Sequence, residues 1–393
     1  MAVDTPAKIA ILGAGPIGLE AALYARFLGY EVALYERGEA AEHLRQTAHV
    51  RWFTPFKQNS SSLGRAALAA QGGVVLPSDD ALLTAGELVD AYFRPLAESD
   101  LLVDGLHEQT EVLASGRGEL LKGELVGDDA RREFPFRVLL RSAEGERVEE
   151  ADVVIDATGV WGRPNSLGAG GIPAVGEAAL AARCEHGLPD VLGARRNDFA
   201  RGHTLVIGAG HSAATNVVAL AELAEREPGT QVTWLVRREG EACASFPVER
   251  LPDDPVPARR ALAERANTLA ASGAVQFLAG RSVLALGETA AGRVAVTLSG
   301  APVETLEVDR VLASVGHRPN RRLSAELHVP EPAGDSATLL LPEPDFYVLG
   351  AKSLGNRGQF LLSQGHAQVR QLFSILGDRA DLDLYRTIGR TKL

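Results

Sequence analysis

The segment that decides the fold reads Lys8-Ile9-Ala10-Ile11-Leu12-Gly13-Ala14-Gly15-Pro16-Ile17-Gly18. Its first five residues form a short apolar run, which predicts a buried strand. The Ala- and Leu-rich residues 19–28 predict a helix that ends at Gly29-Tyr30, and a second strand is expected over 31–36. Residues 8–36 therefore predict one β-α-β unit.

The glycines of this segment indicate a dinucleotide site. Gly13 permits a tight turn, Gly15 lets a diphosphate approach the backbone, and Gly18 lets the helix pack closely on the strand. The free N–H groups at the start of the helix attract the diphosphate. Glu36, at the end of the second strand, is placed to accept hydrogen bonds from ribose hydroxyls. The remaining candidates at this site are Pro16, Ile17 and Arg37.

A second copy of the pattern begins with the apolar run 203–207. Its last glycine is replaced by a small residue, Ala213, and its second strand ends in arginines rather than an acid. A carboxylate there would repel a ribose 2′-phosphate, whereas a guanidinium pairs with it. His211 either contacts the nicotinamide or diphosphate or caps the helix. The predicted binding residues are Gly208, Gly210, His211, Ser212, Ala213, Arg237 and Arg238. One site suited to a free ribose and one suited to a phosphorylated ribose predict FAD and NADPH as cofactors.

Two similar strand exits accompany the two glycine motifs. Residues 153–155 run into Asp156-Ala157-Thr158-Gly159, and residues 311–313 run into Ser314-Val315-Gly316. The same order of features occurs twice, which indicates an internal repeat. We expect an α/β fold with two Rossmann-like, doubly wound dinucleotide-binding domains, the second inserted into the first. The expected FAD domain covers 1–165 and 316–393, and the expected NADPH domain covers 166–315.

Composition narrows the function further. The net charge of −11 disfavours nucleic acid and anionic membranes as partners. No apolar run reaches transmembrane length, and a strand expected from Lys8 leaves no room for a signal peptide. Cys184 and Cys243 form no C-x-x-C, so we expect inert thiols and a cytoplasmic protein. No His, Cys, Asp or Glu cluster has metal-ligand spacing, so no metal is expected.

The sequence also predicts several further helices, strands and turns. Residues 43–64 are expected to be irregular, and residues 84–99 to form a helix with Thr84 as N-cap. The segment Arg131-Arg132-Glu133 is expected to be a solvated turn. Strands are expected at 136–140, 147–155 and 346–350, followed by a helix from about 361 to 376.

With these motifs in place, the chain resembles the flavoproteins with two dinucleotide-binding domains. These include thioredoxin-reductase-like enzymes, flavin-containing monooxygenases and lysine/ornithine N-hydroxylases. The resemblance covers nearly the whole chain and is carried by residues 13–18, Asp156-Ala157-Thr158-Gly159, Gly208-Ala209-Gly210 with Arg237, Ser314-Val315-Gly316-His317-Arg318-Pro319-Asn320, and Phe346-Tyr347-Val348-Leu349-Gly350. It implies FAD in the first domain and NADPH in the inserted one.

The resemblance also suggests residues near the flavin. Gln58 and Asn59 lie in a segment that passes the isoalloxazine ring in similar proteins, where amides would orient flavin N5 or a substrate; a simple polar loop is the alternative. Thr158, Gly159 and Gly350 are expected at the cofactor. Lys352 and Gln364 surround the strand-to-helix exit after Gly350, where solvated or capping roles are the alternatives.

The sequence motifs specify the reaction less well than the cofactors. Dithiol reductases of this group carry a C-x-x-C, and many reductases carry an Asp directly after the last glycine; here Ala351-Lys352 follows Gly350. The F-x-G-x-x-x-H motif of flavin-containing monooxygenases is also missing. We expect hydride transfer from NADPH to FAD, then O₂ activation and oxygenation of a small nucleophilic substrate. The alternatives are a reductase for a quinone, disulfide or protein acceptor, and a non-catalytic redox sensor. The substrate and the oligomeric state, with a homodimer as one option, stay open.

Overall fold

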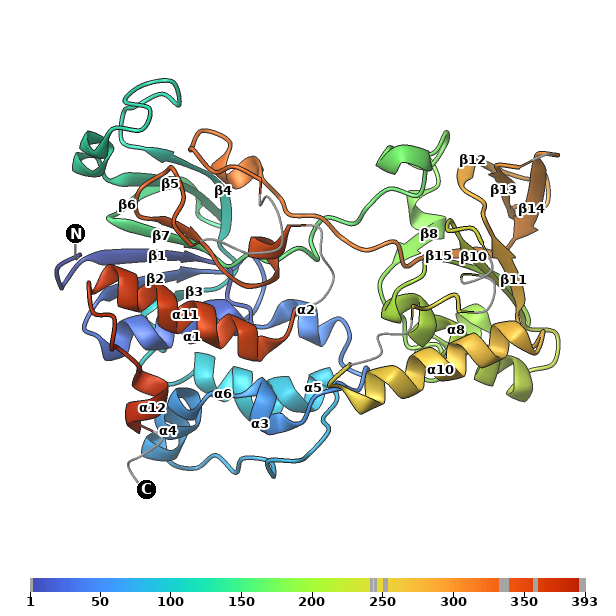
Figure 1. The fold of residues 1–393 in the computed structure, drawn as a ribbon, viewed down its shortest axis with the longest axis horizontal. Coiled ribbons are helices and arrows are strands. Elements are labelled where there is room, and N and C mark those ends of the chain that lie inside the picture. Colours follow the sequence, from blue (N-terminus) through green and yellow to red (C-terminus); the bar gives the residue numbers. More distant parts are fainter. Residues whose placement is uncertain are drawn as a thin grey trace. The chain divides into compact units, whose positions relative to one another are not determined.

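The chain forms two compact units. The computed structural model describes residues 3–240, 243, 246–249, 254–300, 302–331, 339–355 and 360–388. The first unit comprises Met1–Arg163 and Arg318–Leu393, and the second comprises Pro164–His317 (Figure 1). The second unit thus interrupts the first in sequence. The boundaries expected from the sequence, after residue 165 and before residue 316, lie within two residues of these limits.

A parallel five-stranded sheet in the order β16-β7-β1-β2-β3 forms the centre of the first unit. The strands are β1 (Lys8–Leu12), β2 (Glu31–Tyr35), β3 (Leu106–His107), β7 (Val153–Asp156) and β16 (Phe346–Val348). Leu12 pairs with both Tyr35 and Asp156. The carboxyl ends of three neighbouring strands therefore lie level, at the edge where open parallel sheets bind ligands.

The helices of the first unit lie on one side of this sheet, where α1 packs directly against β1 and β2 (Figure 1). They are α1 (Pro16–Phe27), α2 (Glu42–Arg45), α3 (Phe56–Asn59), α4 (Ser62–Gln71), α5 (Ala85–Leu88), α6 (Arg94–Ala97), α11 (Leu362–Leu376) and α12 (Leu384–Ile388). The expected helix at 84–99 is confirmed, with a π turn at Val89–Phe93, and Thr84 forms a capping box with Glu87. The expectation of an irregular 43–64 is wrong in part, because α2, α3 and the start of α4 lie there. Ser61 caps α4 by accepting from the N–H of Gly64 at 2.8 Å.

An antiparallel sheet in the order β4-β5-β6 belongs to the same unit. Its strands are β4 (Glu111–Arg117), β5 (Phe136–Ser142) and β6 (Gly145–Ala151). The single strand expected at 147–155 is in fact two, since the chain leaves β6 and enters β7 of the parallel sheet. Phe136, Val138 and Leu140 of β5 are buried against Leu12, Val154 and Phe346 of the parallel sheet.

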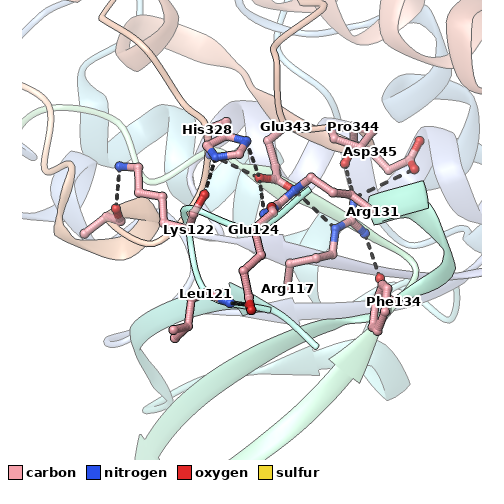
Figure 2. A network of polar contacts seen from close by, with 11 residues as sticks. Arg117, Leu121, Lys122, Glu124, Arg131, Phe134, His328, Glu343, Pro344 and Asp345 are labelled. Atoms are coloured by element: carbon pink, nitrogen blue, oxygen red, sulfur yellow. Dashed lines mark hydrogen bonds and ion pairs between the residues drawn. The ribbon is translucent and has the colours of Figure 1, made fainter. Parts of the chain in front are cut away.

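A buried ion network joins β4 to the chain segment that precedes β16 (Figure 2). Glu343 accepts from Nε of Arg117 at 3.2 Å and from Nη2 of Arg131 at 2.9 Å, and these three side chains are no more than 1% exposed. The Arg117 guanidinium also lies 3.7 Å from the centre of the Phe136 ring. The expectation of a solvated turn at Arg131 is therefore wrong. Its side chain is held inside by the carboxylate and by the carbonyl oxygen of Glu124.

The second unit repeats this plan. Its parallel sheet has the order β11-β10-β9-β15-β8 and a three-stranded antiparallel sheet has the order β12-β13-β14. The strands are β8 (Cys184–His186), β9 (His203–Ile207), β10 (Gln231–Val236), β11 (Gln276–Ala279), β12 (Val283–Glu288), β13 (Val294–Leu298), β14 (Glu304–Val308) and β15 (Arg310–Ala313), and the helices are α7 (Arg196–Phe199), α8 (His211–Arg226) and α10 (Pro257–Ala271). Trp234 of β10 is buried in the core between sheet and helices.

Three further properties bear on function. Cys184 and Cys243 are free and buried, as expected. Within the described part of the chain, no group of three His, Cys, Asp or Glu residues is arranged to hold a metal ion. None of the described helices combines the length and apolar character that crossing a membrane requires.

Glu20 of α1 is a buried carboxyl group that belongs to no sequence motif. It is 1% exposed, and its Oε1 has no hydrogen-bond partner among the described residues. Burial raises the pKa of Glu20 from 4.5 to about 7, and the nearby hydroxyl groups of Ser61 and Tyr385 offset only part of that rise.

A pH-dependent stability difference follows for Glu20→Gln. The folded chain holds the Glu20 proton more tightly than the unfolded chain, so wild-type stability falls as the pH rises from 4.5 to 7. The free energy of unfolding of Glu20→Gln should match wild type below this window and exceed it above by about 3 kcal/mol. Urea denaturation on both sides of the window measures this difference. Parallel pH profiles for the two proteins would show that Glu20 is not kept neutral.

Candidate dinucleotide sites

The turn after β1 requires glycine at its first position. Gly13 has φ of +93°, and a Cβ there would lie 2.9 Å from the Cα of Thr158. Its N–H donates to the carbonyl oxygen of Tyr35 at 2.7 Å, while the N–H of Ala157 donates to Leu12 at 2.9 Å. The exits of β1, β2 and β7 are therefore hydrogen-bonded to one another, and the Gly13 turn contacts the Thr158 turn directly.

The other two glycines of the motif have opposite surroundings. Gly15 is the N-cap of α1, and a Cβ there would meet nothing within 4 Å. A Cβ on Gly18 would lie 1.8 Å from the carbonyl oxygen of Gly13. Gly18 thus sets the close contact of helix and turn, with Pro16 and Ile17 between the two glycines. Gly15 faces open space at the helix N-terminus, where free N–H groups suit a diphosphate.

Glu36 is held in place by the backbone of this turn. Its Oε2 accepts from the N–H of Ala14 at 2.9 Å, and its Oε1 accepts from the N–H of Gly38 at 3.1 Å. A carboxylate has about four acceptor positions, so capacity remains for ribose hydroxyls. The neighbouring Arg37 is exposed, and its Nη2 lies 3.3 Å from Nε2 of His43. These positions fit the roles expected for Glu36 and Arg37, which stay predictions.

Lys352 and Thr158, far apart in sequence, meet at the carboxyl end of β7. The ammonium of Lys352 donates to Oδ2 of Asp156 and, at 3.0 Å, to Oγ1 of Thr158. Thr158 in turn donates through its N–H and hydroxyl to Oδ1 of Asp156 at 3.1 and 2.7 Å. Gly159 follows with φ of +67°. These contacts join the β7 exit to the turn after β16.

The turn after β16 also contacts the start of α1. Gly350 has φ of +72°, and a Cβ there would lie 3.6 Å from the side chain of Ile17. The N–H of Gly350 donates to Oε1 of Gln368 at 2.9 Å, and Nε2 of Gln368 donates to Ser353 at 2.8 Å. The exits of β1, β7 and β16 therefore converge on one place.

Three other candidates have protein partners or lie on the surface. Asn59 is buried, donates to the carbonyl oxygen of Thr54 at 2.8 Å and accepts from its hydroxyl at 2.7 Å. Gln58 is exposed on α3. Gln364 accepts from the N–H of Leu361 at 2.8 Å and so caps α11, the alternative role considered for it. The structure gives Asn59 and Gln364 local structural contacts, and a cofactor role for either remains a prediction.

The second motif reproduces the first. Gly208 has φ of +136°, and a Cβ there would lie 2.2 Å from the carbonyl oxygen of Ser314. The N–H of Gly208 donates to Leu235 at 3.0 Å, and the N–H of Ser314 donates to Ile207 at 2.8 Å. At Gly210, the N-cap of α8, a Cβ would again meet nothing within 4 Å. Ser314 thus stands where Ala157 stands in the first unit.

The start of α8 carries the remaining candidates of the second unit. Ala213 is fully buried, so its Cβ is accommodated where the first motif tolerates only Gly18. Ser212 is exposed and His211 is partly buried. Burial lowers the pKa of His211, as does the nearby Arg259 guanidinium, while Asp254 acts in the opposite direction. The His211 imidazole therefore favours its neutral form.

An ion pair that sequence reasoning missed lies near His211. The guanidinium of Arg259, near the start of α10, donates to both carboxylate oxygens of Asp254, with 2.7 Å between Nε and Oδ2. Asp254 also accepts from the N–H of Val256 at 2.9 Å. Asp254 lies in a loop that contains no recognisable sequence motif, so this ion pair could not be predicted from the sequence.

The two arginines after β10 differ in their contacts. Arg237 is exposed. Arg238 donates to the carbonyl oxygen of Pro247 at 3.0 Å and lies 3.7 Å from the carboxylate of Glu249. Glu239 follows on the same loop and lies close to Gly280. Arg238 thus supports the loop, and a phosphate-binding role for Arg237 remains a prediction.

Comparisons with known proteins agree with this arrangement. No family model and no curated protein matches the sequence. Among solved structures, the chain is similar to bacillithiol disulfide reductase from Bacillus cereus, with TM-score 0.70, 17% identity, and coverage of 95% of this chain and 99% of that one. It is also similar to an ornithine N-hydroxylase from Kutzneria sp. 744, with TM-score 0.63, 17% identity and coverage of 95% and 99%, a structure containing reduced FAD and NADP⁺. A third is the FAD-bound cadaverine monooxygenase of Erwinia amylovora, with TM-score 0.63, 14% identity and coverage of 97% and 96%.

Proposed function

Because the chain has the fold of the flavoproteins with two dinucleotide-binding domains, we propose that it is an FAD- and NADPH-dependent oxidoreductase. FAD binds the first unit and NADPH the second. The observation that carries the proposal is the duplicated turn. Gly13 against Ala157 and Gly208 against Ser314 share one hydrogen-bond pattern, and each is followed by a glycine N-cap facing open space. Two such sites in one chain suit a donor and an acceptor of the same hydride.

The residues around each turn fit the proposed cofactors. In the first unit, Gly15 leaves room for the diphosphate and Glu36 accepts hydrogen bonds from the adenosine ribose. In the second unit, Gly210 leaves the corresponding room and Arg237 pairs with the 2′-phosphate. The cofactors supply hydride transfer from the nicotinamide to the flavin, and the protein supplies binding and orientation.

We further propose that O₂ is the electron acceptor and that a small nucleophilic substrate is oxygenated. The state of the cysteines supports this choice over a dithiol reductase. Cys184 and Cys243 are both buried and free, and burial raises the pKa of Cys184 to about 11. A thiol of such high pKa is not a thiolate near neutral pH and is a poor nucleophile toward disulfides. A reductase that passes electrons to a quinone, an external disulfide or a protein remains the second candidate.

Rapid mixing experiments test the proposal. The purified protein should be yellow and release FAD on denaturation. After reduction by NADPH, mixing with O₂ should give a transient absorbance band that differs from both oxidised and reduced flavin. Direct reoxidation, with steady NADPH consumption only when a quinone or disulfide is added, would favour the reductase. Cofactor binding without turnover would instead indicate a redox sensor.

The coenzyme preference gives a separate prediction. Arg237→Ala should raise KM for NADPH about tenfold or more, because a charge-assisted hydrogen bond to the 2′-phosphate is lost. KM for NADH, which lacks that phosphate, should change little. Steady-state kinetics with both coenzymes measure the two effects in one protein. An equal change for NADPH and NADH would reject the assignment of Arg237.

A further inference from the structure

A buried polar cluster in the first unit takes no part in either candidate dinucleotide site. Its centre is the carboxyl group of Glu20 on α1, with which the Tyr385 hydroxyl of α12 interacts without a well-aligned hydrogen bond. The hydroxyl oxygen of Tyr385 is buried, although α12 has an exposed side formed by Arg386 and Thr387. Among the described residues, no cation acts on Glu20, so its ionised form is a buried, unpaired charge.

Contacts with α1, α4 and α11 hold α12 in place. The N–H of Leu384 donates to the hydroxyl of Tyr24 at 3.0 Å, and the hydroxyl of Ser62 donates to the carbonyl oxygen of Tyr385 at 2.8 Å. The Tyr385 ring packs edge-on against Tyr24, with 5.3 Å between the ring centres, and lies 6.0 Å from the His366 ring. Because α12 has only five residues, it depends on this packing to remain helical.

Glu20 is the group of this cluster that changes its charge near neutral pH. Burial raises the pKa of Glu20 to about 7 and lowers the pKa of His366 to about 4, so the imidazole is already neutral. Burial also raises the pKa values of the phenols Tyr24, Tyr92 and Tyr385, which keep their protons. The charged groups that act on Tyr24 or Tyr92, and not on Glu20, are Arg65, Arg370 and Asp383.

We propose that Glu20 and Tyr385 form a proton-operated latch, which holds α12 against α1 and α4 while the Glu20 carboxyl group is protonated and releases α12 when that group ionises. Ionisation passes the proton to solvent and leaves an unpaired negative charge beside Tyr385. Release of α12 lets water reach this charge and breaks only the contacts of one short helix, which costs less than unfolding the unit. The latch is a property of the first unit and does not depend on the proposed cofactors.

Hydrogen exchange of backbone amides tests the latch. Peptides from α12 are followed by mass spectrometry, and each exchange rate is divided by the rate of an unfolded chain at the same pH. Protection of α12 in the wild type should fall about tenfold between about pH 6 and pH 8, because the Glu20 pKa is about 7 in the closed state and 4.5 in the open state. Glu20→Gln keeps the size of the side chain and cannot ionise, so its protection should not change over this range.

Tyr385→Phe gives a second test that does not depend on Glu20→Gln. The substitution keeps the ring contacts and removes a hydroxyl group that offsets part of the effect of burial on the Glu20 pKa. The closed state then holds the proton to a higher pH, so protection of α12 should fall more steeply with pH than in the wild type. A wild-type slope in Tyr385→Phe would show that the ring serves packing alone and would remove Tyr385 from the latch.

Amides of α11 in the same samples separate local release from unfolding of the whole unit. If α12 is released by itself, its amides exchange faster than those of α11 at every pH. A common exchange rate for the two helices would mean that the unit opens as a whole and would overturn the proposal. Protection of α12 that is independent of pH in the wild type, or that falls equally in Glu20→Gln, would overturn it as well.

Discussion

Glu343→Gln is expected to lower the free energy of unfolding of the first unit by about 3–5 kcal/mol. The substitution preserves size and removes only the charge that pairs with Arg117 and Arg131 (Figure 2). Both guanidinium groups are buried, so water cannot replace the lost carboxylate. The remaining acid nearby, Asp345, lies 4.0 Å from Arg117 and is itself shared with Arg132.

A matched control shows whether the loss of stability comes from burial of the charges or from the loss of any ion pair. Asp80→Asn breaks the exposed ion pair of Asp80 with Lys57, whose N–O distance is 2.7 Å, and should leave the free energy of unfolding almost unchanged. Urea denaturation of the two variants under the same conditions gives the comparison. Similar small losses for both would mean that the Glu343 network does not hold the antiparallel sheet to the β16 segment.

The second large effect is expected for Gly18→Ala. A Cβ at this position would lie 1.8 Å from the carbonyl oxygen of Gly13, which is backbone and cannot move aside as a flexible side chain would. Helix α1 must shift away from the turn, so we expect a loss of about 3 kcal/mol in stability. FAD binding should be lost with it, because the helix N-terminus and the turn no longer present their N–H groups together.

The second motif supplies the control for this prediction. Ala213, in the position equivalent to Gly18, is buried without a clash. Ala213→Gly should therefore cost only about 1 kcal/mol, the helix-propensity difference between the two residues. Thermal denaturation and FAD content of both variants measure the contrast. Normal FAD content in Gly18→Ala would refute the close contact between α1 and the Gly13 turn.

Much of the fold was predictable because its determinants are local. The turn at Gly13 needs a positive φ, the helix start at Pro16 needs no N–H partner, and the strand pattern of residues 8–12 is uniformly apolar. Each of these is visible in a window of a few residues. The second glycine motif, which begins at Gly208, predicts a second unit of the same kind. The structure confirms two parallel sheets with the same type of turn.

The missed features depend on contacts between distant residues. The sequence around Arg131 predicts a solvent-exposed side chain, because no neighbouring residue indicates its buried partner Glu343. The position of Lys352 after the last strand predicts only that it lies near the flavin. No local pattern indicates its ion pair with Asp156, which precedes it by almost half the chain. Such pairs arise from topology, here from the adjacency of β7 and β16.

The most direct test of two separate dinucleotide sites is a pair of alanine substitutions at the helix N-caps. Gly15 and Gly210 both have extended backbone that alanine adopts, and both face open space, so the apoproteins should keep wild-type stability. We predict that Gly15→Ala weakens FAD binding and leaves NADPH affinity unchanged, while Gly210→Ala does the reverse, as measured by titration of each ligand. If both variants bind FAD and NADPH as wild type does, the open spaces at the two helix starts are not cofactor sites and the account is wrong.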